Sequence, residues 1–382
     1  MQCRLCTCAL DISESIKLGR MPSLAQYLPD TLEDSKRSQV DLVIASCDIC
    51  GLVQTLNPPA PYYREAIRNA SLSTELMSHR RKRFQEFITK YNLIGKNIVE
   101  IGCGQGELIN LMSQLQVNVQ GTEWNDEYVA YCRSQGQNVK KTYPLEDNFF
   151  PSFLQETFDG FYTMQFLEHC PSPKDFLLRL QRILNPGAVG IVEVPNYDLI
   201  QSNGLVNEFM VDHVTYFSKE TLTRLLSSTG FRVNAVDSLF HEYILSVQVE
   251  KATPNSLSAF RNRYESMALD GRNFIEVVGQ TGIVVWGAGH QAMANIKLFD
   301  LEKSIHYVVD SAPSKQGKFI PSTDLVIKSP EILRADSSIS TLVLMSAGFN
   351  DEIRRIVISD FKFIQKLFEV NMGRLIEISL PR

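Results

Sequence analysis

The stretch Val99–Gly106, with the sequence VEIGCGQG, has residue types and spacing that can hold a nucleotide-like ligand. Gly102, Gly104 and Gly106 alternate with larger residues, so the backbone can turn sharply and a ligand can approach with no Cβ in the way. A short buried strand is predicted just before the stretch. An apolar helix is predicted just after it, and the first N–H groups of that helix are free to bind a ligand. The alternative is a structural turn without a ligand.

A second strand, predicted over Val119–Glu123, ends in an acid at the usual place of a ribose-hydroxyl acceptor. In a dinucleotide fingerprint the glycines fall as G-x-G-x-x-G. Here they fall as E-x-G-x-G-x-G, led by Glu100. This spacing resembles the first motif of class I S-adenosylmethionine (SAM) methyltransferases. The resemblance implies that Glu100, the three glycines and Glu123 bind SAM.

Two C-x-x-C pairs near the N-terminus can present four thiolates to one metal ion, which completes a tetrahedral zinc site. The cysteines of these pairs are Cys3, Cys6, Cys47 and Cys50. The gap between the two pairs is longer than in the usual zinc ribbon. The alternative to a zinc site is that these cysteines are redox-active or unpaired. Because four protein ligands leave no open coordination position, we expect a structural zinc ion that stabilises a segment too small for a core of its own.

The segments Leu18–Pro22 (LGRMP) and Cys50–Gln54 (CGLVQ) accompany the cysteine pairs. Together they resemble the N-terminal zinc module of the NDP-sugar C-3 methyltransferases, enzymes of branched deoxysugar biosynthesis. The rest of the chain is consistent with that family over nearly its whole length. In the family a tyrosine near the next, proline-rich linker reaches the sugar. Tyr62 and Tyr63 stand at that place, and Tyr63 is our predicted substrate contact, with a packing role as the alternative.

Further segments resemble the central domain of such enzymes in their order and spacing. Leu145 and Glu146 follow the next predicted strand, where residues beside the adenine are expected. The strand predicted over 158–164 ends at QFLEH, which resembles the xxLEH segment of SAM-dependent methyltransferases. The resemblance implies that Gln165 lies against the cofactor. His169 can act as a base, but the resemblance favours a structural role.

The segment Glu208–Ser218, EFMVDHVTYFS, resembles the catalytic segment of the same family. There a tyrosine precedes an acidic residue and a histidine. The acid and the histidine match Asp212 and His213, while the tyrosine position is Met210 in this chain. A histidine titrates near neutral pH and can take a proton in the transition state. The match implies His213 as the base, with Asp212 orienting its ring or binding a substrate hydroxyl; a structural loop histidine is the alternative.

A second strand–glycine–helix unit begins at 282–290, GIVVWGAGH, and closes with Tyr307–Asp310. An acid after the second strand is typical of a dinucleotide fold. However, no third glycine follows Gly289 at the expected place. The unit resembles the C-terminal domain of the same family, which helps hold the nucleotide-sugar, and so implies Lys315 as a substrate contact. The family's lysine after Gly-Ala is Gln291 here.

Helices and strands must position these motifs. The length of 382 residues suits two or three domains of roughly 150 residues each. Alternating strands and helices predict an α/β protein. We expect a zinc module over 1–60, a doubly wound class I SAM methyltransferase sheet over 61–250, a connector helix over 251–279 and a Rossmann-like domain over 280–382. Leu184–Gly187 is predicted to be a turn between two elements.

Composition excludes several classes of function. The net charge of −5 and the pI near 5.8 direct the chain neither to nucleic acid nor to an anionic membrane. The basic cluster His79–Arg83 is predicted to be a solvated helix face rather than a polyanion site. No stretch has the roughly 18 apolar residues that span a bilayer, and no secretory signal opens the chain. We expect a cytoplasmic protein in which cysteines bind metal or are buried.

The sequence therefore predicts a SAM-dependent methyltransferase of a nucleotide-activated deoxy or keto sugar. On a 4-keto sugar His213 would take the C-3 proton, and the enolate would accept the methyl group. One alternative is a sugar O-methyltransferase in which the same histidine deprotonates a hydroxyl. Others are an NAD-dependent oxidoreductase using the C-terminal domain and a non-catalytic zinc-bearing binding protein.

Overall fold

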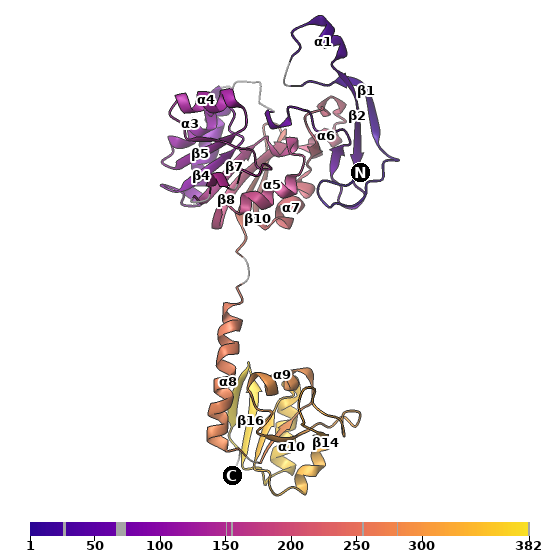
Figure 1. Ribbon diagram of the computed structural model, residues 1–382, viewed down its shortest axis with the longest axis vertical. Coiled ribbons are helices and arrows are strands. Elements are labelled where there is room, and N and C mark those ends of the chain that lie inside the picture. The colour runs from indigo at the N-terminus through magenta and orange to yellow at the C-terminus, as the bar shows by residue number, and fades with distance from the viewer. Residues whose placement is uncertain are drawn as a thin grey trace. The chain divides into compact units, whose positions relative to one another are not determined.

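A computed structural model gives the structure of the chain in two compact units, Met1–Pro254 and Asn255–Arg382 (Figure 1). Each unit contains its own sheet core, and each is described by itself. The structure describes residues 1–380 apart from 26–27, 66–73, 150, 154–155, 254–255 and 281. No helix in this described part is both long enough and apolar enough to cross a membrane.

The N-terminal segment forms an antiparallel sheet that a distant strand completes. Its strands in spatial order are β1 (Ile16–Pro22), β2 (Gln39–Ser46), β3 (Val53–Thr55) and β9 (Thr215–Tyr216), and α1 (Leu32–Arg37) lies between β1 and β2 in the chain. Val53 and Gln54 pair with Tyr216 and Thr215. The cysteine-bearing segment is thereby joined to the chain just beyond Asp212 and His213.

The first unit is built on the doubly wound sheet that the sequence predicted. Its spatial order is β10-β11-β8-β7-β4-β5-β6, with β4 to β8 parallel and β10 and β11 antiparallel. The bounds are β4 (Asn97–Ile101), β5 (Asn118–Glu123), β6 (Val139–Lys141), β7 (Phe158–Met164), β8 (Leu184–Pro195), β10 (Phe231–Leu239) and β11 (Ile244–Lys251). All parallel strands therefore end at one edge, where ligands of such sheets bind.

Helices cover both faces of this sheet and bury its apolar side chains. On one face Phe84 of α2 and Leu108 of α3 pack with Ile98, while on the other Phe176 of α5 and Leu225 of α7 form a core. The helices are α2 (Thr74–Lys90), α3 (Glu107–Ser113), α4 (Asp126–Ser134), α5 (Pro173–Gln181), α6 (Tyr197–Ser202) and α7 (Lys219–Ser228). Short 3-10 turns are η1 (Tyr63–Glu65), η2 (Pro151–Phe153), η3 (Leu167–His169) and η4 (Val206–Glu208).

Two local predictions are wrong. Leu184–Gly187 is not a turn between two elements but the start of β8. The pairing of β8 with β7 shifts register between Phe158 and Gly160, because the extra residues of β8 form a bulge there. The basic cluster is no fully solvated face either. Arg80 is 2% exposed and forms an ion pair with the buried Glu193 of β8, because α2 packs on the sheet.

The second unit is a mixed sheet with helices on its faces. Its order is β14-β13-β12-β15-β16-β17, with only β17 antiparallel to its neighbour. The predicted strand–glycine–helix unit is formed by β12 and α9. The bounds are α8 (Ser258–Val278), β12 (Ile283–Trp286), α9 (His290–Leu298), β13 (Ile305–Val309), β14 (Ile327–Lys328), η5 (Pro330–Arg334), β15 (Thr341–Leu344), η6 (Ala347–Phe349), α10 (Asn350–Asp360), β16 (Lys366–Asn371) and β17 (Arg374–Ile378).

Candidate active site

The glycine loop after β4 leaves room at one of its three glycines. All three have positive φ, so any other residue would be strained there. A Cβ at Gly102 would lie 2.4 Å from the Phe166 ring, and one at Gly106 would lie 1.9 Å from Oε1 of Gln137. A Cβ at Gly104 would meet no atom within 4 Å. Gly102 and Gly106 are thus required by packing, while Gly104 faces the space into which a ligand can come.

The acid predicted for ribose binding lies directly on this loop. The Glu123 carboxylate accepts hydrogen bonds from the backbone N–H groups of Gly104 at 2.9 Å, Trp124 at 2.8 Å and Asn125 at 2.9 Å. The carboxylate therefore ties the glycine loop to the residues that follow β5. Glu100 is 3% exposed and accepts a hydrogen bond from the Tyr162 hydroxyl at 2.9 Å. It therefore supports the loop from within the sheet.

The two residues predicted beside an adenine have different surroundings. Glu146 forms an ion pair of 2.6 Å with Arg64, whose guanidinium stands over the Trp124 ring 5.2 Å from its centroid. Since Trp124 follows Glu123, Arg64 links Glu146 to the end of β5. Leu145 packs against the core and lines a shallow cavity with residues of α5. Sequence reasoning missed Arg64 and Trp124, because neither carries a motif.

Gln165 stands where β7 ends beside the glycine loop. Its φ of +55° is left-handed, a conformation uncommon for a residue with a side chain, and its N–H donates to the Glu193 carbonyl at 2.8 Å. The next residue, Phe166, is the ring that lies against Gly102. The chain is thus turned out of the sheet at the loop and continues into η3.

The predicted catalytic residues meet η3 through β9. The Val214 N–H donates to the Glu168 carbonyl at 2.9 Å, which fixes the preceding residues beside η3. Asp212 is 1% exposed, and its Oδ1 accepts a hydrogen bond of 2.8 Å from the Tyr62 hydroxyl. Of the two tyrosines after the proline-rich linker, Tyr62 is thus the one at Asp212. The ring of Tyr63 packs edge-on against Tyr143, with centroids 5.7 Å apart.

His213 and His169 form a ring pair, with centroids 4.8 Å apart and planes at 71°. Nδ1 of His169 is 3.1 Å from the Asp212 carbonyl, so it carries the proton and donates it to that oxygen. Burial, together with repulsion by His169, holds the pKa of His213 well below its usual range, so its imidazole is neutral at neutral pH. The Asp212 backbone, and not its side chain, contacts a histidine ring.

Met210 occupies the place of a family tyrosine, and another tyrosine lies beside it. The Met210 N–H donates to the Tyr216 hydroxyl at 3.0 Å, and that hydroxyl lies 3.2 Å from the Met210 carbonyl. The Tyr216 ring is 6.0 Å from the His213 ring. A phenol is therefore present near this segment, supplied by β9.

The four cysteines of the two pairs come together. Sγ atoms are 3.5 Å apart for Cys3 and Cys50 and for Cys6 and Cys47, and all four lie within 4.8 Å of one another. Zn–S bonds of about 2.3 Å in a tetrahedron place sulfurs roughly 3.8 Å apart. Burial raises the pKa of the Cys6 thiol, but hydrogen bonds from the Cys8 backbone and from neighbouring thiols outweigh burial and lower this pKa to about 7. The set fits a tetrahedral zinc ion.

Lys315 lies in a cavity of the second unit rather than on open surface. Its ammonium forms an ion pair of 2.9 Å with Asp310, whose carboxylate also accepts the Ala288 N–H at 2.8 Å. Both charged residues line a cavity of about 610 Å³ together with Trp286 and Gln291. The acid after β13 thus holds the glycine turn after β12 and the lysine at one place.

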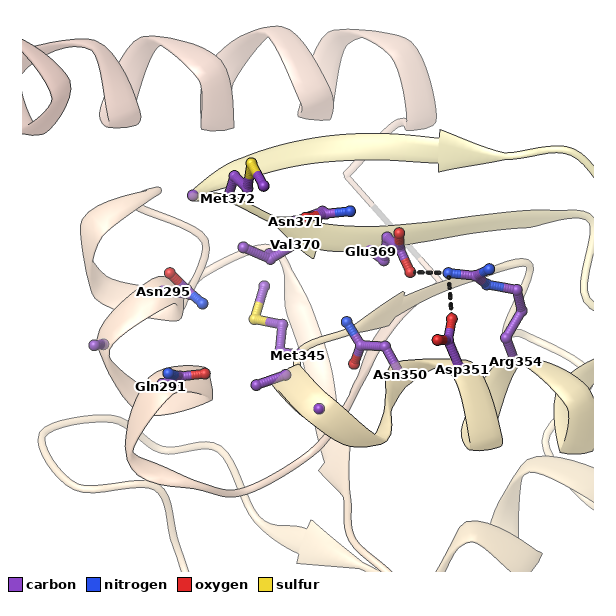
Figure 2. A pocket seen from close by; sticks show the side chains of 14 residues that line it. Gln291, Asn295, Met345, Asn350, Asp351, Arg354, Glu369, Val370, Asn371 and Met372 are labelled. Carbon is purple, nitrogen blue, oxygen red and sulfur yellow. Dashed lines mark hydrogen bonds and ion pairs between the residues drawn. The ribbon is translucent and has the colours of Figure 1, made fainter.

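A second cavity of about 540 Å³, which sequence reasoning did not anticipate, shares Gln291 with the first (Figure 2). Figure 2 shows Arg354 held between the carboxylates of Asp351 and Glu369 at its rim. Asn350 is 7% exposed and accepts the Ser346 N–H at 2.8 Å. Amide side chains dominate this wall of the cavity.

Comparison with known proteins relates most of the chain to methyltransferases. Residues 73–236 match the family described as methyltransferase domain, and residues 246–359 match the family described as C-methyltransferase C-terminal domain. The C-methyltransferase NovU of Streptomyces niveus is 21% identical over 364 residues, which cover 86% of each chain. A probable SAM-dependent methyltransferase of Mycolicibacterium smegmatis is 27% identical over 153 residues, 38% of this chain and 56% of that protein.

The coverage of other relatives is smaller. The chain spans between 44% and 59% of the length of three curated relatives that it matches. Among solved structures, a SAM-dependent methyltransferase from Clostridium acetobutylicum is similar with a TM-score of 0.39 and 12% identity, covering 48% of this chain and 94% of that chain.

Proposed function

We propose that this chain is a SAM-dependent C-methyltransferase that adds a methyl group to a carbon atom beside the carbonyl group of a nucleotide-activated sugar. One observation carries the proposal. The open space at Gly104 follows β4, and the neutral His213 lies on a segment bonded to η3, which follows β7, the neighbour of β4 in the sheet. The match of the second unit to a C-methyltransferase domain supports carbon as the methylated atom.

The residues around the glycine loop fit SAM. The space at Gly104 would admit the cofactor, Glu123 would accept its ribose hydroxyls, and Gln165 with Glu146 would border it. When bound, SAM supplies a methyl group made electrophilic by a sulfonium. The chain must then align a carbon nucleophile and remove its proton.

His213 would remove that proton. Because its imidazole is neutral, it can accept the proton from the carbon beside the carbonyl, and the electrons of the C–H bond pass into an enolate. The Tyr62 hydroxyl donates its one proton to Asp212 and accepts the Ala25 N–H, so in this arrangement it fixes the Asp212 side chain. A role of Tyr63 at the sugar stays a prediction.

The second unit has a cavity of its own, in which the Lys315 ammonium is a group that can bind a phosphate. A role of Lys315 as a substrate contact stays a prediction. NovU, a C-methyltransferase by name, is similar over both units, which supports a shared architecture. Zinc in the four-cysteine cluster would stabilise the N-terminal segment and take no part in the reaction.

The test is a proton-exchange experiment. The purified chain is incubated in D2O with a nucleotide-activated 4-keto sugar and without SAM, and exchange at C-3 is followed by NMR. We expect enzyme-dependent exchange, then C-methylation once SAM is added, because His213 acts on carbon before methyl transfer. His213→Asn should abolish exchange and keep SAM affinity. Methylation of a hydroxyl without carbon exchange would show an O-methyltransferase and contradict the proposal.

A further inference from the structure

Glu168 is a buried acid for which the proposed methyl transfer has assigned no role. Its side chain lies in η3 and is 2% exposed, and its Oε2 has no hydrogen-bond partner among the described residues. Its backbone carbonyl is engaged, accepting the N–H of Val214 at 2.9 Å. A buried carboxyl oxygen without a partner costs stability, so such atoms persist mainly where they serve a function.

The surroundings of this acid point to its function. Glu168, His169 and His213 each place a side-chain N or O atom within 4.8 Å of the others. His169 is held by its bond to the Asp212 carbonyl, so it does not turn to accept a proton from Glu168 on Nδ1. His213 has no such fixed bond to a carbonyl among the described residues. The acid therefore faces the ring that would take up a proton.

We propose that Glu168 is a positioning residue whose carboxylate stabilises the imidazolium formed when His213 takes the substrate proton. This inference rests on the proposed function. In the step, the C–H bond of the substrate breaks, its electron pair enters the enolate, and the proton forms a new N–H bond on His213. In the alkaline range, where it is ionised, Glu168 stays a carboxylate throughout the step and supplies a negative charge to a site from which water is largely excluded.

The proposal predicts a particular pH dependence. Burial raises the pKa of Glu168 to about 8, so its carboxyl group is mostly neutral at neutral pH and becomes a carboxylate in the alkaline range. Turnover should therefore rise with pH around this value. His213 does not produce this rise, because burial and His169 place its pKa on the acid side.

Other ionisable groups near η3 do not account for the same rise. His169, buried beside His213, has a lowered pKa. Asp212 is bonded to Tyr62, and Tyr216 on β9 has a pKa raised by burial. Glu193 on β8 is paired with Arg80. No lysine or arginine in the described part of the chain forms an ion pair with Glu168.

The first test compares the wild-type chain with Glu168→Gln, which keeps the shape and removes the charge. We expect kcat of the variant to be lower on the order of a hundredfold in the alkaline range, from the lost attraction of two charges at this separation. The gap should shrink below neutral pH, and SAM affinity should not change. Glu220→Gln, a substitution of an exposed side chain on α7, serves as the control and should keep the alkaline rise.

A second readout needs no turnover and separates this inference from the proposed function. The ring signals of His213, followed by NMR against pH, should inflect near the ionisation of Glu168 in the wild type and lose that inflection in Glu168→Gln. If Glu168→Gln does not fold, Glu168→Asp keeps the charge and should retain the inflection. An unchanged profile in Glu168→Gln would overturn the proposal, even where no sugar is methylated by the wild type. So would an inflection that added Mg²⁺ or Mn²⁺ abolishes, since the cluster would then bind a cation.

Discussion

Replacing Gly104 with alanine should separate the role of this glycine in cofactor binding from its role in the backbone. Gly104 has a φ of +54°, a left-handed conformation that costs other residues roughly 1–2 kcal/mol. Its added Cβ would meet no protein atom within 4 Å. Gly136, which follows α4, has a φ of +76° and equally open surroundings. Gly136→Ala therefore carries the same backbone cost at a residue outside the loop, next to Gln137, which bonds to the Gly106 carbonyl.

We expect both variants to lose about 1–2 kcal/mol of unfolding free energy. In a unit of this size each kcal/mol lowers Tm by about 2–4 °C, which thermal unfolding of the full chain measures. Only Gly104→Ala should also lose affinity for SAM, because its methyl group enters the space that the cofactor would fill. The loss should be at least tenfold, or about 1.4 kcal/mol, in a calorimetric titration with SAM.

Two results would refute this reasoning. Wild-type affinity in Gly104→Ala would mean that the ligand does not approach this glycine. An equal loss in Gly136→Ala would mean that affinity follows stability and not the added methyl group. Gly102→Ala is a poor substitute for this test, since its Cβ would lie 2.4 Å from the Phe166 ring and would disturb packing and binding together.

Three further variants test other parts of the chain. Cys47→Ser should lose bound zinc and lower Tm, because it removes one of four ligands; unchanged zinc by metal analysis would contradict the site. Arg80→Met should lower the unfolding free energy by about 3–5 kcal/mol in a urea titration, since the buried Glu193 loses its partner; wild-type stability would speak against the ion pair. Lys315→Met should destabilise the second unit at neutral pH and much less at acid pH. Burial raises the pKa of Asp310, but the hydrogen bond from Lys315 outweighs burial and holds this pKa below its unfolded value. The ion pair therefore contributes stability above the unfolded pKa, and this contribution is lost as the pH falls through the folded pKa. An effect independent of pH would contradict this.

The Tyr62 hydroxyl and the Asp212 carboxylate show why the candidate site was only partly predictable. The acid and the histidine beside it were predicted from one continuous segment of sequence, and the tyrosine predicted to contact the substrate is Tyr63, the neighbour of Tyr62. The hydrogen bond between Tyr62 and Asp212 joins residues 150 positions apart. No local pattern distinguishes two adjacent tyrosines after a proline-rich linker, because the choice depends on the direction in which the folded chain leaves that linker.

The same limit applies to buried charges. Arg80 belongs to a basic run that predicts exposure, yet it is buried against Glu193, 113 residues further along the chain. Glu168 stands in a motif that identifies it as part of the site, but the motif does not indicate that one oxygen of its buried carboxyl group has no hydrogen-bond partner among the described residues. Burial of a charge is decided by which elements pack together, and composition does not report this.

The sequence by itself determined the features that depend on neighbouring residues. The glycine loop, the strand before it, the acid at Glu123 and the two cysteine pairs are encoded within short segments, since backbone conformation and thiol spacing are local properties. Tertiary structure alone decided the pairing of β3 with β9, which joins the cysteine-bearing segment to the chain beside His213. It also decided the meeting of Glu168, His169 and His213, because distance between side chains is fixed by packing across the fold.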